Sequence, residues 1–175
     1  MCRPARRLTR DRKRGTRDSR AQFHRGRGLP KRRRTFNVSP SSVTDPIAHG
    51  LPHREPFLFV DRVRHHIPGS EAVGEKTFAR ETPMFAGHFP GNPIVPGVIL
   101  AEALAQVAGI AGSSEKGFLL SAIRAMKFPS PAKPGETITL RATKTGSLGG
   151  LFQFSVSADV DGRIVAEGKI VLNEL

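Results

Sequence analysis

The sequence has no tryptophan and no tyrosine, and its single cysteine is Cys2. One thiol cannot form a disulfide framework, and it cannot supply the several thiolates of a structural zinc site. No apolar run reaches the length of about 20 residues that a membrane-spanning helix needs. We therefore expect a chain without disulfides, without a metal site built on thiolates and without a membrane span, and we expect it to be cytoplasmic.

Acidic residues are scarce at one end of the chain. Residues 1–34 hold 15 Lys and Arg but only two Asp, which accounts for the whole net charge of +13. Residues 35–175 hold 13 basic and 13 acidic residues, so we expect no nucleic-acid binding by this neutral part. We predict a basic, disordered extension at residues 1–42 and one folded domain at residues 43–175.

Four interpretations of the basic extension are open. An Arg-rich arm can bind nucleic acid or anionic surfaces by counterion release, act as a transit peptide, or dock an acidic carrier protein. The fourth interpretation is a segment without function, either an inert tail or translated sequence upstream of the true start. We favour the fourth, since the extension lacks the apolar region of a secretory signal and a clear amphipathic face.

The folded part is organised around a loop and a helix. Three prolines and three glycines fall within residues 85–97, which excludes a regular helix or a central strand there. Residues 98–111 are apolar apart from Glu102 and Gln106, and Pro96 suits the first turn of a helix. A helix that is apolar almost all round is a buried helix.

Glu102 and Gln106 are four residues apart, so they lie on one face of this helix. A carboxylate on a buried helix is costly without polar partners. His88 lies on the loop fourteen residues earlier. A loop imidazole and a buried carboxylate indicate a general base and a general acid. The alternative is structural, with Glu102 and Gln106 as a packing device and His88 as a turn residue.

The residues themselves favour the catalytic alternative. The segments GHFPGNPIVPGV (87–98), EALAQ (102–106) and LPHREPF (51–57) resemble the signature of the FabZ-type (3R)-hydroxyacyl-acyl carrier protein dehydratases. The resemblance covers about residues 51–172. It implies the hotdog fold, an α+β architecture in which an antiparallel sheet wraps a central hydrophobic helix.

The resemblance also implies a reaction, the dehydration of (3R)-3-hydroxyacyl-acyl carrier protein to trans-2-enoyl-acyl carrier protein in fatty-acid or related biosynthesis. His88 then takes the C2 proton, and Glu102 protonates the leaving hydroxyl or positions the water that does so. Gln106 orients Glu102, and the free N–H groups near Gly97 and Val98 stabilise the developing oxyanion. No cofactor and no metal are implied.

In proteins with this resemblance, the His and the acidic residue of one site come from different chains. A homodimer is therefore implied, with a hexamer built as a trimer of dimers as a further step. The acyl chain is expected beside the helix, although for every candidate lining residue we favour a place in the core. The candidates are Phe89, Ile94, Val95, Val98 and Phe128.

Hydrophobic periodicity predicts the surrounding strands. We expect strands near residues 57–63, 72–78, 118–128, 137–144, 152–160 and 164–172. Asp161-Gly162 predicts a two-residue hairpin and residues 146–150 a turn. We assign His53 to a structural turn, and we expect His65 and His66 to point to opposite faces of a strand, which disfavours a metal pair.

The sequence departs from the family pattern at several positions. No tyrosine is present to gate the acyl tunnel, Glu55 replaces an aromatic residue, and Arg124 stands where Asp is usual. The departures leave a specialised pathway as plausible as housekeeping fatty-acid synthesis. Two other functions stay open, a non-catalytic acyl-binding hotdog subunit and a hotdog thioesterase, but the presence of both His88 and Glu102 favours dehydration.

Overall fold

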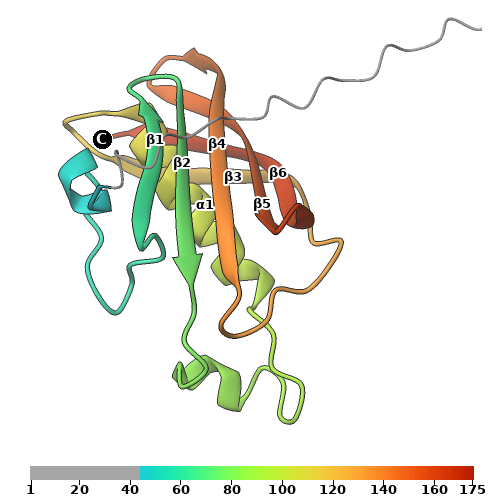
Figure 1. Cartoon of the computed structure of the whole chain (residues 1–175). Helices are drawn as coiled ribbons and strands as arrows, with labels where there is room; N and C mark the ends of the chain where they lie inside the picture. The colour runs from blue at the N-terminus through green and yellow to red at the C-terminus, as the bar shows by residue number, and fades with distance from the viewer. Residues whose placement is uncertain (1–43) are drawn as a thin grey trace, which may run out of the picture. The chain divides into compact units, whose positions relative to one another are not determined.

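The computed structural model describes residues 44–175. The predicted basic extension and its four interpretations lie outside the described residues. Residues 44–175 form one antiparallel sheet, one long helix and two 3-10 helices (Figure 1). The elements are η2 (Pro46–His49), β1 (Arg62–Ile67), β2 (Glu71–Thr77), η3 (Pro83–Ala86), α1 (Gly97–Gly112), β3 (Phe118–Lys127), β4 (Thr137–Leu148), β5 (Leu151–Val160) and β6 (Arg163–Glu174).

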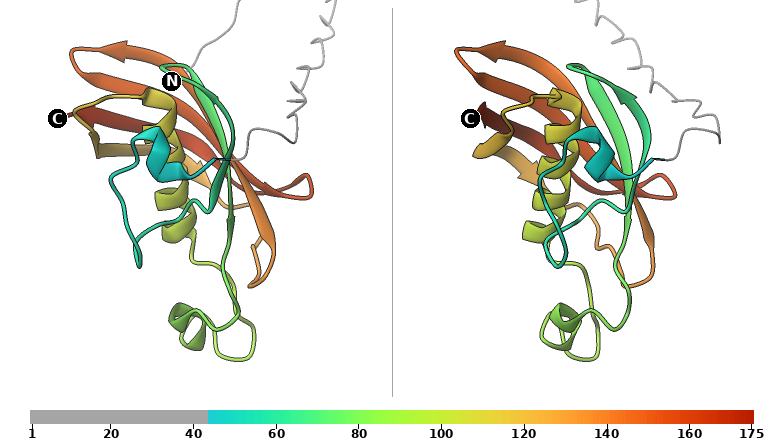
Figure 2. Two further views of the ribbon diagram at one scale, coloured as in Figure 1. Left: turned by 60° about the vertical axis from the view of Figure 1, so that its left-hand side comes forward. Right: turned by 90° about the vertical axis from the view of Figure 1, so that its left-hand side faces the viewer.

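The sheet curves around α1. Its strand order is β1-β2-β4-β5-β6-β3, and every neighbouring pair is antiparallel. The two side views show α1 packed against the concave face, with η2 beside the helix (Figure 2). This arrangement confirms the α+β prediction of an antiparallel sheet wrapped around a buried helix.

The central helix α1 begins and ends close to the predicted residues. Pro96 is its N-cap, and Ser113 ends it in the left-handed conformation at φ 53, with its N–H bonded to the Gly109 carbonyl. Most of its side chains are buried because β2, β4, β5 and β6 pack on it. Strand β2 comes so near that a Cβ on Gly74 would lie 3.2 Å from Val107.

Periodicity located five of the six strands but misplaced the first. The run at residues 57–63 was expected to be a strand, yet β1 begins only at Arg62. The structure gives the reason: the Phe57 carbonyl and the Phe59 N–H bond to the side chain of Gln106, so they cannot take part in a strand ladder. The run therefore crosses the helix as an irregular segment.

The turns follow the local chemistry. Asp161 and Gly162 both have positive φ, 48 and 83, as a type I′ hairpin requires, and they join β5 to β6. The turn predicted at residues 146–150 is shorter than expected. It consists of Gly149 and Gly150, because β4 continues to Leu148. The side chains of His65 and His66 were expected to point in opposite directions on the strand. In keeping with this, His65 contacts Glu71, whereas His66 contacts Ser113.

The two edges of the sheet differ. Beside β1, Thr44 forms an isolated antiparallel bridge with Val63. Strand β3 pairs with β6 on one side, and no other strand among residues 44–175 covers its outer edge. It is rich in exposed apolar side chains, with Leu119 56%, Leu120 42% and Ile123 47% exposed. An uncovered apolar edge of this kind is a natural template for pairing with another chain.

Candidate active site

His88 lies on the loop between η3 and α1, which extends beyond one end of the sheet (Figure 1). Its Nδ1 lies 3.1 Å from the Ile94 carbonyl oxygen, and the Ile94 N–H donates back to the His88 carbonyl. A carbonyl only accepts, so the proton of the neutral ring belongs on Nδ1. Nε2 then keeps a free lone pair, which is the state a general base needs.

Glu102 lies in the second turn of α1, where Gln106 holds it. Gln106 Nε2 donates to Glu102 Oε1 at 3.1 Å and to the Phe57 carbonyl at 3.1 Å. Its Oε1 accepts from the Phe59 N–H at 2.8 Å. With a side chain only 2% exposed, Gln106 is a fixed connection between α1 and the chain that precedes β1.

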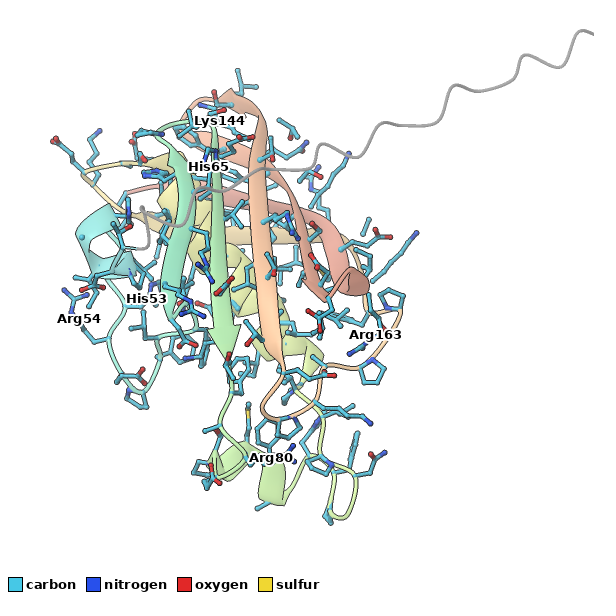
Figure 3. The ribbon with its side chains drawn as sticks, in the orientation of Figure 1. His53, Arg54, His65, Arg80, Lys144 and Arg163 are labelled. Atoms are coloured by element: carbon cyan, nitrogen blue, oxygen red, sulfur yellow. The ribbon has the colours of Figure 1, made fainter. Side chains whose placement is uncertain are left out.

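His53 also lies at Glu102, although the sequence assigned it to a turn. Its Nε2 is 3.6 Å from Glu102 Oε1, and its ring stacks on Phe57. Figure 3 shows His53 on the segment between η2 and β1. Its buried Nδ1 has no hydrogen-bond partner among the described residues. The one signal in the sequence was its position in the LPHREPF segment, because spacing along the chain does not connect residue 53 with residue 102.

A cavity of about 230 Å³ opens at this cluster. It lies along one face of α1, between the residues around η2 and the start of β3. Glu102, Gln106 and His53 form one polar part of its wall, His49, Ser113 and Ser114 form another, and the rest is mainly apolar. The apolar walls are formed by Leu51, Phe57, Ala105, Phe118, Leu120 and Leu172.

The predicted acyl-binding residues are not on this cavity. Val95 lies in the core at 3% exposure, whereas Phe89 and Val98 are 53% and 76% exposed. Phe128 packs over the helix start, 3.1 Å from the position a Cβ would take on Gly97. Ile94 is half-buried and accepts from His88. The structure thus gathers these residues around the start of α1, apart from the cavity at Glu102.

The start of α1 exposes backbone donors. The first hydrogen bonds there are donated by Ile99 and Leu100 to the Pro96 carbonyl, at 3.0 and 3.1 Å. The N–H groups of Gly97 and Val98 precede that ladder and point out of the helix end. They can therefore donate to an oxyanion, with support from the helix dipole.

His88 and Glu102 do not meet within one chain. Among residues 44–175, no hydrogen bond or ion pair connects them, and His88 is not part of the cavity wall. The structure brings together Glu102, Gln106 and His53 at one place, and His88, Gly97 and Phe128 around the loop and the helix start.

A histidine pair lies at the far end of the cavity, where His49 forms part of the wall. His49 Nδ1 is 2.9 Å from His66 Nδ1, and His66 Nε2 is 2.9 Å from Ser113 Oγ, which donates to the Ile110 carbonyl. Burial, and then the neighbouring His49, lowers the pKa of His66 below its ordinary value of 6.5. No group of three or more His, Cys, Asp or Glu within residues 44–175 is arranged to hold a metal ion.

Comparisons with known proteins identify the family. Residues 64–169 match the protein family described as ApeI-like, ApeI dehydratase. A 3-hydroxyacyl-[acyl-carrier-protein] dehydratase FabZ from Ruminiclostridium cellulolyticum is 46% identical over 125 residues, which cover 69% of this chain and 88% of the relative. The FabZ of Acetivibrio thermocellus is 44% identical over 125 residues, covering 69% of this chain and 86% of the relative.

The chain belongs to the FabZ family of dehydratases. The comparison with solved structures shows the fold. The dehydratase heterocomplex ApeI:P from Xenorhabdus doucetiae superposes with a TM-score of 0.64 at 15% identity, covering 75% of this chain and 92% of that one. Protein PH1136 from Pyrococcus horikoshii gives a TM-score of 0.60 at 19% identity, covering 77% and 95%. This member of the FabZ family thus has the expected hotdog fold. No helix among its described residues is long and apolar enough to cross a membrane.

Proposed function

We propose that this protein removes water from (3R)-3-hydroxyacyl-acyl carrier protein and releases trans-2-enoyl-acyl carrier protein, in the cytoplasm. The observation that carries the proposal is Glu102, a carboxylate held by Gln106 on the wall of a mainly apolar cavity, in a chain of the FabZ family. A hydroxyl leaving as water needs an acid at that position, and the acyl tail needs an apolar wall beside it.

The reaction needs two proton transfers. His88 Nε2 takes a proton from C2, and the electron pair moves toward the thioester oxygen. The N–H groups of Gly97 and Val98 stabilise the negative charge that develops on that oxygen. As the C3–O bond breaks, Glu102 gives its proton to the leaving hydroxyl, and water departs. His88 then holds the proton from C2, and Glu102 is ionised because its proton left with the water. Proton exchange with the solvent returns both groups to their starting states.

We infer that the active unit is a homodimer, in which His88 of one chain works with Glu102 of the other. Two features support this. His88 and Glu102 are separate within one chain, and the cavity at Glu102 is partly lined by Leu119 and Leu120 of β3, the uncovered apolar edge. Pairing two β3 edges would bring a second chain to the cavity. Assembly of three dimers into a hexamer is a further step of the same proposal.

The test is hydration and dehydration of a short 3-hydroxyacyl thioester, carried by acyl carrier protein and by coenzyme A. The conjugated enoyl absorbance reports the reaction. We expect turnover by the wild type and a loss of roughly 10²–10⁴-fold in His88→Ala and in Glu102→Gln. Glu115→Gln is the matched control, since Glu115 is exposed and lies off the cavity.

Two results would contradict the proposal. A wild-type protein without turnover on either carrier, with its fold intact by circular dichroism, would point to an acyl-binding subunit instead. Turnover that survives His88→Ala would show that the base is another group.

A further inference from the structure

We propose that Gly109 determines how long an acyl chain this enzyme binds favourably. Each added carbon strengthens binding up to about eleven to twelve carbons, and longer chains bind no more tightly. The proposal rests on the proposed function, because it places C3 of the substrate at Glu102. The proposal concerns the part of the cavity wall beyond the reacting atoms. Along α1, this part begins with Gly109 and continues with a group of polar side chains.

The cavity follows one face of the helix. Its lining includes Glu102, Ala105, Gly109 and Ser113, which recur every three or four residues. At about 1.5 Å per residue, Gly109 lies roughly 10 Å along the helix from Glu102. A tail that leaves the reacting carbons at Glu102 therefore runs past Ala105 to Gly109.

Gly109 keeps this path open. A Cβ built on it would have no heavy atom within 4 Å, so the space beside it belongs to the cavity. Gly112, at the end of the same helix, is different, because a Cβ there would lie 2.6 Å from the Phe118 ring. Glycine is a poor helix former, and nothing in the backbone requires one at position 109, since its φ is not in the left-handed region. The open space beside Gly109 is then the path of the acyl tail.

The wall becomes polar just beyond Gly109. His49, Ser113 and Ser114 line this end, and Ser113 is exposed to solvent. Hydrogen bonds hold these groups in place: His49 to His66, His66 to Ser113, and Ser114 to Glu174. A methylene that reaches this end removes no further apolar surface from water, so it adds no binding.

The distance along α1 gives the length of the tail. About 10 Å accommodates eight or nine bonds of an extended chain, at roughly 1.2 Å per bond. Added to the three carbons at the reaction centre, this predicts a limit near eleven to twelve carbons.

The experiment measures kcat/KM for 3-hydroxyacyl-acyl carrier proteins of 4, 6, 8, 10, 12 and 16 carbons. For the wild type, we expect kcat/KM to rise with each buried methylene, by up to about fourfold per carbon, and to level off near twelve carbons. Gly109→Ala should move the plateau about one carbon shorter. Gly109→Leu should move it about four carbons shorter and lower the ratio of the 12-carbon to the 4-carbon rate at least tenfold.

Two further variants separate chain length from general damage. Ser155→Leu adds the same side chain at an exposed site on β5 that is not on the cavity, and it should leave the length profile of the wild type unchanged. His49→Leu makes the far end apolar, and it should raise the rate with 16 carbons relative to 12 at least threefold.

The outcomes are distinct. No turnover with any chain would contradict the proposed function. Turnover that rises steadily to 16 carbons, or a Gly109→Leu profile that is lowered equally at all lengths, would overturn the role of Gly109 while the proposed reaction stands.

Discussion

Gln106 Nε2 donates a hydrogen bond to Glu102 Oε1 across one turn of α1, at 3.1 Å. The same amide bonds to the Phe57 carbonyl and the Phe59 N–H. The orientation of the proposed acid is thereby tied to a segment more than forty residues away in the sequence. This hydrogen bond holds one carboxylate oxygen of Glu102 in place on the cavity wall.

Replacing Gln106 by leucine should therefore affect both stability and rate. Gln106→Leu replaces the amide by an apolar side chain of similar size and leaves two backbone groups without a partner, which costs about 1–3 kcal/mol. We expect that loss in urea unfolding, together with a fall in kcat of at least tenfold. Gln153→Leu, which loses only a bond to Thr145, is the control. Wild-type kcat in Gln106→Leu would show that Glu102 needs no orientation.

His53 should act as a positioning residue for Glu102, because its Nε2 lies 3.6 Å from the carboxylate. His53→Leu removes the nitrogen and keeps the packing against Phe57, so we expect kcat to fall about tenfold with little change in KM. His53→Gln restores a side-chain N–H and should recover most of the rate. Equal kinetics in the two variants would mean that the ring serves only to pack.

The proposed site shared between two chains can be tested by mixing inactive variants. A homodimer of either variant, His88→Ala or Glu102→Gln, has two inactive sites. In a mixed dimer, one site carries both substitutions and the other carries neither, so dissociation and reassociation of the pair should restore up to half of the wild-type rate per mixed dimer. If both groups act within one chain, every site in the mixture holds one substitution, and the activity stays lost.

Stability should fall below neutral pH because of His66. Burial, followed by the charge of His49, lowers the pKa of His66 from 6.5. The unfolded chain then binds a proton near pH 6.5 that the folded chain resists, so the free energy of unfolding falls as the pH drops below 6.5. The groups that face the ring are His49, His65, Ser113 and the Ile110 carbonyl.

Urea midpoints at pH 8 and pH 5.5 measure this effect. We expect a lower midpoint at pH 5.5 for the wild type and a smaller difference for His66→Gln, which keeps a polar group beside Ser113 but cannot take up the proton. An equal difference in both proteins would assign the pH dependence to other groups.

Local chemistry was enough to predict most of the elements. The helix followed from an apolar run that starts after Pro96, and the last hairpin followed from Asp161-Gly162, since both signals act within a few residues. The segment 57–63 was misplaced for the converse reason. Its apolar run is of strand length, but the side chain of Gln106 takes up its backbone groups, and that contact exists only once the chain is folded.

The sequence by itself determined the family, the fold class and the pairing of Glu102 with Gln106, because helical spacing and a long motif are properties of neighbouring residues. Only the tertiary structure decided that His53 lies at Glu102, that His88 does not meet it within one chain, and that the cavity follows α1 past Gly109. These relationships join segments far apart in the sequence. Their distances depend on how the sheet curves around the helix, which no local pattern encodes.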